Sequence, residues 1–312
     1  MPTADDISWQ VLRRIVQDWQ GESAELDEVK PLVGGSVNQT AALHTSDGSR
    51  AVLKMSAHRV NRDLEREARQ LDLLRDLGFP TPRVYLRHTG SLDHPFSYLL
   101  MELLEGVSLA EARMQCSAEV YDRLQERLAE MIASLHDHTE EAYRRVASTN
   151  GQSHTFASWP AFYHAVYDGI WHEVEMSQQL PAKCRKQIRK VHDRLDRLIA
   201  HADCPRLVHW DIWATNVLVA PDAAGEWQIA AVIDPNCKYA HAEAEIAYME
   251  LFHTVTPAFM KTYRARHRLP PEYYQIRRPV YQLYPLINHL NLFGHDYLKP
   301  LQAAVERLGG IV

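Results

Sequence analysis

The spacing of hydrophobic and polar residues divides this chain into a part that predicts strands and a part that predicts helices. Between about Leu26 and Leu104, short apolar runs alternate with turns, which is typical of a small β-sheet. The clearest strand-like runs are Ala41–His44, Ala51–Lys54 and Ser97–Met101. One helix is expected within this part, from about Asn61 to Leu77, because Gly78 and two prolines follow it.

From Ser108 onward the pattern becomes helical. Val120–His136 and Ala182–Ala202 both carry charge on one face and apolar residues on the other, which predicts amphipathic helices. We therefore expect an α+β, bilobal fold. Residues 1–105 would form a sheet-rich N-lobe, and residues 106–312 would form a larger helical C-lobe.

The run Leu207–Val219 carries the spacing H-x-D-x-x-x-x-N at His209, Asp211 and Asn216. A kinase catalytic loop has this spacing, with the aspartate at the acceptor hydroxyl and the asparagine on Mg²⁺. A further aspartate, Asp234, follows a strand-like run. The pattern predicts Asp211 as the catalytic residue, Asn216 and Asp234 as metal ligands, and a structural role for His209. With this loop, the expected bilobal fold is protein-kinase-like. The N-lobe (residues 1–105) would bind the nucleotide, and the C-lobe (residues 106–312) would hold the catalytic loop and the acceptor pocket. A His/Asp metallohydrolase fits poorly, because the 17 histidines are mostly scattered.

Nucleotide-binding candidates lie in the N-terminal part. Gly34, Gly35 and Ser36 sit between two predicted strands, where the backbone can approach phosphate oxygens, although a Gly-Gly turn is usually only a hairpin. Lys54 ends a strand-like run, as the phosphate-binding lysine of kinases does, although a lysine there is normally a solvated edge residue.

The predicted helix after Lys54 offers two carboxylates, Glu65 and Glu67, that could pair with this lysine. Glu67 lies three residues after Leu64 and four before Leu71, so it shares the apolar face with them, whereas Glu65 turns away. A charge on an apolar face is costly unless paired, so Glu67 is the expected partner of Lys54. The alternative is a glutamate at the rim of an amphipathic stripe.

The hinge between the two lobes is expected near Glu102–Gly106, where an apolar strand breaks at a glycine. Backbone groups near Glu102 and Leu104 would pair with adenine there, and the alternative is an ordinary buried strand.

The composition of the chain restricts the kinds of partner and the location that we expect for the protein. The formal net charge of -6 argues against a nucleic-acid partner. No apolar run approaches the roughly 18 residues that a membrane helix needs. The N-terminus shows no signal-peptide pattern, and the four cysteines are widely spaced, so a reducing, cytoplasmic location is expected. The oligomeric state has no signature in the sequence.

Several motifs together resemble the fructosamine kinase (ketosamine-3-kinase) family. They are Gly34–Asn38, His209–Asn216, Asp234-Pro235 with His241–Glu243, Glu250–Phe252 and Tyr281–Gly294, and they cover nearly the whole chain. The resemblance implies ATP, Mg²⁺ and transfer of the γ-phosphate to a sugar hydroxyl of a ketoamine, such as a glycated amine. The aminoglycoside phosphotransferases are wider relatives, so an aminoglycoside or related antibiotic is the alternative acceptor. A nucleotide-binding pseudokinase is the non-enzymatic alternative, but its usual hallmark is a missing lysine, aspartate or asparagine.

The chain departs from the family pattern at several positions. The family usually has glycine between the loop histidine and aspartate, where this chain has Trp210. Some antibiotic phosphotransferases look similar here, so Trp210 leaves the acceptor open. Lys238 stands where an aromatic residue is more common, Ala240 where glycine is, and Ser36 where relatives often have cysteine.

The acceptor-binding candidates are Trp213, His241, Glu243 and His289. An acidic residue such as Glu243 could bind the amine of a ketoamine or aminoglycoside. It would also suit a helix N-terminus electrostatically without any ligand. Trp213 and His289 could line the pocket, although aromatic residues on a helix are more often part of the core.

Overall fold

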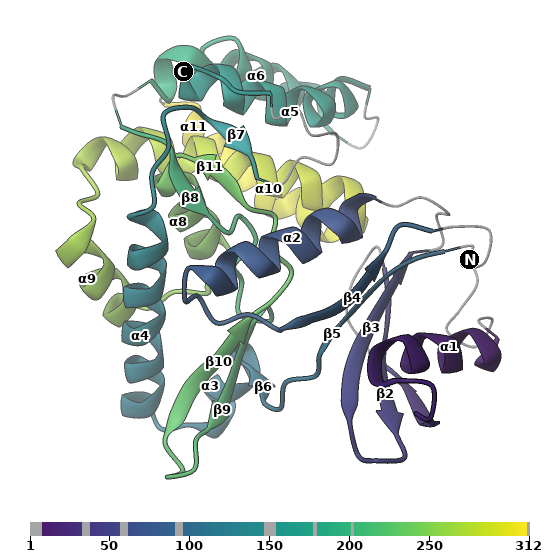
Figure 1. Ribbon diagram of the computed structural model, residues 1–312. Coiled ribbons are helices and arrows are strands. Elements are labelled where there is room, and N and C mark those ends of the chain that lie inside the picture. Colours follow the sequence, from purple (N-terminus) through teal and green to yellow (C-terminus); the bar gives the residue numbers. More distant parts are fainter. Residues whose placement is uncertain are drawn as a thin grey trace. The chain divides into compact units, whose positions relative to one another are not determined.

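The computed structural model describes residues 8–32, 38–56, 62–90, 96–146, 154–176, 180–200 and 203–310. Helices and strands are both present, with a sheet-rich N-terminal region and a helical C-terminal region (Figure 1), so the predicted α+β class is confirmed. None of the helices described is long and apolar enough to cross a membrane. The four cysteines, all within the described residues, are thiols and form no disulfide.

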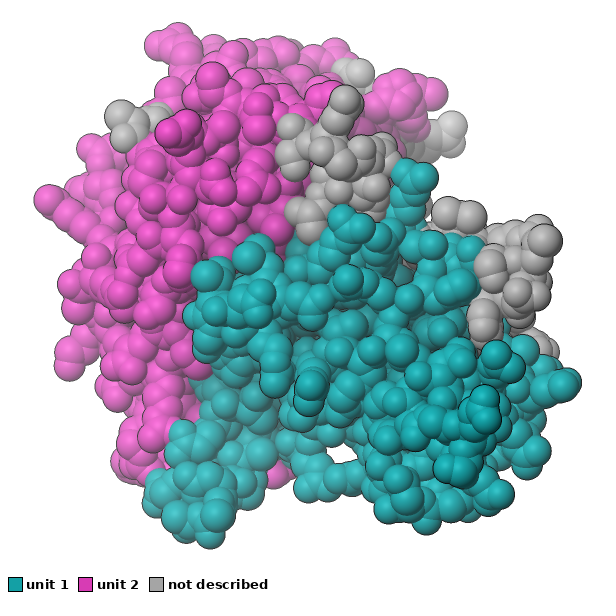
Figure 2. Space-filling model, in the orientation of Figure 1, with its two compact units in different colours: residues 1–107, 147–152, 217–235 teal, residues 108–146, 153–216, 236–312 magenta. Residues whose placement is uncertain are grey.

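The chain forms two compact units (Figure 2). Among the described residues, unit 1 contains those up to Val107 together with Val217–Pro235, and unit 2 contains the remainder. The sequence suggested a single boundary near residue 105. The structure instead groups Val217–Pro235, and with it Asp234, with the N-terminal residues.

Unit 1 is built on a five-stranded sheet of order β1-β2-β3-β5-β4, in which all neighbours are antiparallel. The strands are β1 (Leu26–Pro31), β2 (Gln39–Thr45), β3 (Arg50–Ser56), β4 (Val84–His88) and β5 (Ser97–Glu102). The three strand-like runs of the sequence thus fall in β2, β3 and β5.

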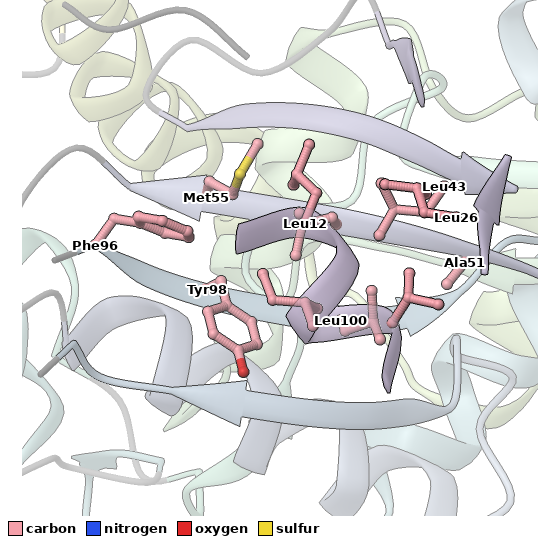
Figure 3. Packing of buried hydrophobic residues seen from close by; sticks show 11 residues of the cluster. Leu12, Leu26, Leu43, Ala51, Met55, Phe96, Tyr98 and Leu100 are labelled. Carbon is pink, nitrogen blue, oxygen red and sulfur yellow. The ribbon is translucent and has the colours of Figure 1, made fainter. Parts of the chain in front are cut away.

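Two helices, α1 (Trp9–Gln20) and α2 (Arg62–Asp76), cover opposite faces of this sheet. One apolar cluster joins α1 to alternate residues of the central strands (Figure 3). Its members include Leu12, Leu43, Ala51, Leu53, Met55, Tyr98 and Leu100. The other cluster joins Leu64, Ala68 and Leu71 of α2 to Val52, Leu99 and Met101. Because side chains alternate along a strand, Lys54 lies on the same face as Val52, the face that α2 covers.

The bounds of α2 agree closely with those of the helix expected from the sequence, whereas α1 was not expected. Leu12, Ile15 and Val16 are buried at helical spacing, and the Ser8 hydroxyl caps the helix by accepting from the Val11 N–H. A serine before this apolar spacing was the available signal.

A hairpin of β9 (Val217–Pro221) and β10 (Trp227–Val232) completes unit 1, and β9 also pairs with β6 (Val107–Ser108). Gly106, in the expected hinge, has φ +143°, and a Cβ there would stand 2.6 Å from the Val219 carbonyl oxygen. Only glycine suits this position, because any side chain would be strained and would collide with backbone.

Unit 2 is mainly helical. Its helices are α3 (Leu109–Gln115), α4 (Ala118–His136), α5 (Trp159–Met176), α6 (Ala182–His192), α7 (Leu195–Leu198), α8 (Ala242–Leu251), α9 (Pro257–Arg266), α10 (Arg278–Phe293) and α11 (Leu298–Leu308), with a π-helical turn at Tyr273–Arg277 and a 3-10 turn at Gly294–Tyr297. The expected helix Val120–His136 is present as α4. The expected helix Ala182–Ala202 is wrong as one element: Arg194 leaves the helical conformation (φ -114°, ψ 6°) after Asp193, a poor helix former.

Unit 2 contains a short sheet of order β7-β11-β8, and its strand β8 leads directly into the catalytic loop. Its strands are β7 (Arg144–Arg145), β8 (Arg206–Val208) and β11 (Lys238–Ala240). Seven of the ten residues of α8, which follows β11, are buried, including the carboxylates Glu243 and Glu245. Carboxylates on a buried helix must find partners, and those partners build the site.

Candidate functional site

In unit 1, Lys54 binds two carboxylates. Its Nζ lies 2.9 and 3.0 Å from the two Glu67 oxygens and 2.6 Å from Asp234 Oδ1. The predicted ion pair with Glu67 is therefore present, and Glu65 instead pairs with Arg69 on the outer surface of α2. Strand alternation turns Lys54 toward α2, and the helical period turns Glu67 toward Lys54.

Lys54 and Glu67 are both largely buried, so the charge of each depends on its partners. Side chains of Lys54 and Glu67 are about a tenth exposed, with relative values of 10% and 11%. Burial alone would lower the pKa of Lys54, but the Glu67 and Asp234 carboxylates raise it above its ordinary value. Burial raises the pKa of Glu67, against the opposing effect of the Lys54 ammonium. The Lys54 ammonium therefore remains charged beside the Asp234 carboxylate.

Asp234 follows β10 with φ 58°, a left-handed backbone that residues with a side chain seldom adopt. Such conformations persist where the surroundings enforce them, and they are frequent at functional sites.

Two further candidates for nucleotide binding lie at the end of β5. Glu102 closes the strand, and its N–H is engaged with the Arg83 carbonyl oxygen at 2.8 Å. Leu104 lies beyond the strand and is partly buried. The roles of Glu102 and Leu104 stay predictions. Gly34, Gly35 and Ser36 lie outside the described residues.

In unit 2, Asp211 is positioned by two contacts. The Tyr248 hydroxyl donates to Asp211 Oδ1 at 2.6 Å, and Asn216 Nδ2 donates to the Asp211 carbonyl oxygen at 3.0 Å. Asn216 is buried at 7% exposure. Because its amide nitrogen is committed, its Oδ1 is the atom with lone pairs for a cation.

Tyr248 was not singled out from the sequence. It lies on α8, three residues after Glu245, so the two side chains share one face of that helix. Burial, reinforced by the Asp211 carboxylate, raises the pKa of Tyr248 above its ordinary value, so it remains a donor. The i, i+3 spacing from a buried glutamate was the signal that could have found it.

Glu245 holds the backbone of the catalytic loop. One of its oxygens accepts from the Trp210 N–H, and the other lies 2.8 Å from His136 Nε2. His209, which is fully buried, contributes its carbonyl oxygen to the Asn236 N–H at 3.0 Å. The loop is thus tied to α8 and to the segment before β11.

Trp210, where the resemblance led us to expect glycine, has φ 72°. This is the left-handed region that glycine enters without strain. The Trp210 ring lies 4.5 Å from Lys238 Nζ and 6.5 Å from the Trp159 ring, centre to centre. Lys238 is itself buried and donates to the Asn236 carbonyl oxygen at 2.7 Å. Trp210 and Lys238, both departures from the family pattern, therefore contact each other.

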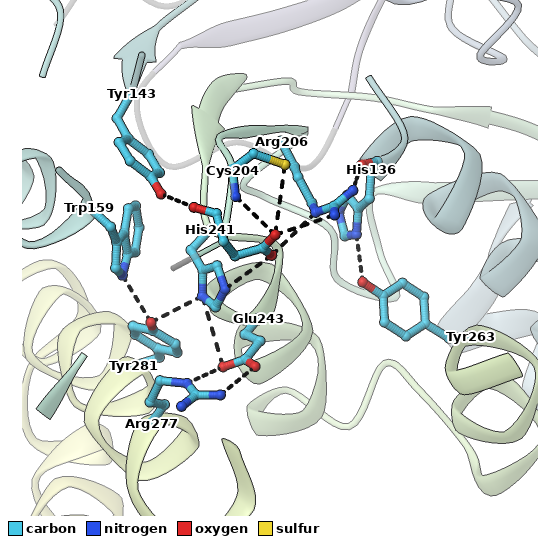
Figure 4. A network of polar contacts seen from close by, with 11 residues as sticks. His136, Tyr143, Trp159, Cys204, Arg206, His241, Glu243, Tyr263, Arg277 and Tyr281 are labelled. Atoms are coloured by element: carbon cyan, nitrogen blue, oxygen red, sulfur yellow. Dashed lines mark hydrogen bonds and ion pairs between the residues drawn. The ribbon is translucent and has the colours of Figure 1, made fainter. Parts of the chain in front are cut away.

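The four acceptor-binding candidates have different surroundings. Trp213 is 40% exposed. His241 is buried and lies 3.2 Å from the Tyr281 hydroxyl and 3.5 Å from Asp203 (Figure 4). Glu243 accepts two bonds from the Arg277 guanidinium, at 2.5 and 2.7 Å. His289 Nδ1 lies 2.7 Å from the Pro285 carbonyl oxygen, and burial lowers the pKa of His289.

Glu243 and His241 therefore belong to a polar network within unit 2 (Figure 4). The carboxylate of Glu243 is already engaged by Arg277, a partner that the sequence analysis did not identify. Acceptor binding by these residues stays a prediction.

Known proteins resemble the chain over nearly its whole length. The sequence model of the family described as fructosamine kinase matches residues 8–309. A protein of Escherichia coli K12 named "Probable ketoamine kinase YniA" is 27% identical over 307 residues, which cover 96% of this chain and 99% of that protein.

Solved structures agree in fold. The crystal structure of a protein named "Putative fructosamine-3-kinase" from Haemophilus somnus 129PT has a TM-score of 0.75 at 20% identity, over 96% of this chain and 97% of that one. The gentamicin–APH(2″)-IIa complex has a TM-score of 0.63 at 15% identity, over 97% and 96%. The fold is thus the kinase-like fold of the aminoglycoside phosphotransferases, as expected. Since the family model spans almost every residue, the chain belongs to the fructosamine kinase family and is a phosphotransferase that acts on hydroxyl groups.

Proposed function

We propose that this enzyme transfers the γ-phosphate of ATP to a sugar hydroxyl of a ketoamine of the fructosamine or ribulosamine type. The observation that carries the proposal is the buried triad of Lys54, Glu67 and Asp234. It supplies a fixed cation for phosphate oxygens and a carboxylate for a divalent metal, the two charges that phosphoryl transfer needs. Relatives named as probable ketoamine kinases support the proposed acceptor class.

Lys54 would bind phosphate oxygens of ATP, and Glu67 would keep the ammonium in place. Gly34, Gly35 and Ser36 would contribute backbone N–H groups, and Glu102 and Leu104 would meet adenine through their backbones. Asn216 and Asp234 would hold Mg²⁺ through oxygen atoms, the ligands that this ion prefers. The committed amide nitrogen of Asn216 and the carboxylate of Asp234 are compatible with this role. When bound, Mg²⁺ would neutralise charge on the phosphates.

Asp211 would accept or orient the proton of the acceptor hydroxyl. The Tyr248 bond to Oδ1 would hold the Asp211 carboxylate in one orientation toward the acceptor. Catalysis would rest mainly on positioning and on neutralising charge. Trp213, His241, Glu243 and His289 remain candidates for the acceptor pocket. The location in the cytoplasm also stays a prediction.

An Asp211→Ala variant tests the mechanism. We expect turnover to be lost while ATP binding, measured by calorimetry with Mg²⁺ present, is retained. Full activity in this variant would refute the assignment of Asp211, and loss of ATP binding would place Asp211 in nucleotide binding instead.

A panel of acceptors tests the substrate. Release of ADP should depend on fructosyl-lysine or ribosyl-lysine, with free lysine and free sugars as controls. Turnover of aminoglycosides without turnover of either ketoamine would overturn the acceptor class and favour an antibiotic phosphotransferase. Nucleotide binding without turnover of any acceptor would favour the pseudokinase alternative.

A further inference from the structure

Three side chains with donor atoms suitable for a metal ion lie close together in unit 2. The proposed kinase reaction uses none of them. His164 and Asp168 lie on α5, and His192 lies at the end of α6. One ligand atom from each residue lies within 4.8 Å of the others. Residues four apart on a helix share a face, so α5 presents His164 and Asp168 together toward the ring of His192.

The two imidazoles have neighbours that restrict their movement. The His192 ring stacks on Trp171 of α5, with ring centres 4.4 Å apart and planes at 9°. His164 Nε2 lies 3.1 Å from Asp196 Oδ1 on α7. A carboxylate bonded to one nitrogen of an imidazole fixes the ring and makes its other nitrogen a better metal ligand, a recurring arrangement around metal-binding histidines.

The chemistry of the donors indicates which metal they suit. Two imidazole nitrogens and one carboxylate form a set that zinc and neighbouring transition metals bind, with ligand bonds of about 2.0–2.2 Å. Mg²⁺ prefers oxygen ligands, so this group differs from the proposed Mg²⁺ ligands of the kinase reaction. Asp168 is exposed and both histidines are partly buried, which gives a metal ion a path from solvent. Metal binding would require side-chain rotations that bring the three donor atoms to the spacing of tetrahedral ligands.

We propose that His164, Asp168 and His192 bind a divalent transition metal, with zinc as the best fit, and that the metal ties α5 to α6. The bound ion would join α5 to α6 through His164 and His192, which are 28 positions apart in the sequence. Its role would be to hold this helical segment in one arrangement, without a part in phosphoryl transfer.

Calorimetry on untagged, metal-stripped protein tests the proposal. ZnCl₂ would be titrated in a large excess of MgCl₂, into the unaltered protein and into the variants His192→Gln, Asp168→Asn and His295→Gln. His295 is an exposed histidine of the 3-10 turn Gly294–Tyr297, outside α5 and α6, and serves as the control. We expect a zinc-binding event in the unaltered protein and in His295→Gln that is weakened at least tenfold in the other two variants. Titration with Co²⁺ should give the visible absorption of a tetrahedral complex, again lost in His192→Gln.

Equal zinc affinity in the unaltered protein, His192→Gln and Asp168→Asn would overturn the proposal, as would the absence of zinc binding in the unaltered protein. Circular dichroism would show whether His192→Gln keeps its helices. Asp168→Asn changes an exposed side chain, so it decides the question if His192→Gln does not fold. Kinase activity is not the readout, so failure here leaves the proposed function untouched.

Discussion

The Tyr248 hydroxyl donates a 2.6 Å hydrogen bond to Oδ1 of Asp211. Tyr248 lies on α8, 37 residues beyond the loop that carries Asp211. A donor bonded to one oxygen of a carboxylate holds that side chain in one rotamer. We infer that α8 positions the proposed base.

Tyr248→Phe removes this bond and keeps the ring. A hydrogen bond to a charged group contributes about 1.5–3 kcal/mol. We therefore expect kcat to fall about tenfold or more, because Asp211 loses the bond that fixes its rotamer. Steady-state kinetics measures kcat, with Tyr274→Phe as the control. A normal kcat would remove Tyr248 from the mechanism.

Lys54→Met should weaken ATP binding and lower kcat/KM by about a hundredfold or more, because a preorganised charge is lost. It also leaves Glu67 buried without its cation, so the free energy of unfolding should fall by about 3 kcal/mol. Lys30→Met, at an exposed lysine of β1 with 57% side-chain exposure, is the control and should match the unaltered protein. Equal ATP affinity in the two variants would contradict the role of Lys54.

Trp210→Gly and Trp210→Ala lose the same contacts with Lys238 and Trp159. They differ in that alanine keeps a Cβ at φ 72°. We expect the glycine variant to be more stable than the alanine variant by about 1 kcal/mol. Denaturant unfolding measures the difference. A more stable alanine variant would show that the backbone leaves the left-handed region when the ring is removed.

Arg277→Met tests whether the buried ion pair between Arg277 and Glu243 stabilises the fold. Both side chains are about a tenth exposed, and removing one partner of a buried pair costs about 3–5 kcal/mol. Urea unfolding should show this loss, whereas Arg268→Met, at an exposed arginine, should unfold like the unaltered protein. If both variants retain full stability, Glu243 is available to an acceptor amine.

Asp203 should contribute to stability against acid. Although burial would raise the pKa of Asp203, hydrogen bonds from His241 and Arg206 lower it well below its ordinary value. A carboxyl group with a lowered pKa when folded stabilises the protein above about pH 4, and the contribution is lost as pH falls below that value. Asp203→Asn should therefore flatten the fall in unfolding free energy below pH 4. An unchanged pH dependence would show that this group is not linked to folding.

Local spacing in the sequence determined much of the first unit. The two-residue period places Lys54 on one face of its strand, and the helical period selects Glu67 over Glu65. Both are properties of a single element, so no knowledge of neighbours is required. The H-x-D-x-x-x-x-N run likewise indicated the reaction class, because phosphoryl transfer needs those groups close together in one loop.

Only the tertiary structure decided contacts between residues distant in the chain. Tyr248 with Asp211, Glu245 with Trp210, and Arg277 with Glu243 are separated by 37, 35 and 34 positions. No periodicity reports such pairs, because they depend on how α8 packs. The left-handed backbone at Trp210 was also hidden, since a tryptophan gives no sign of a position that favours glycine. The sequence determined the chemistry of the catalytic loop, and packing against α8 decided how that loop is held.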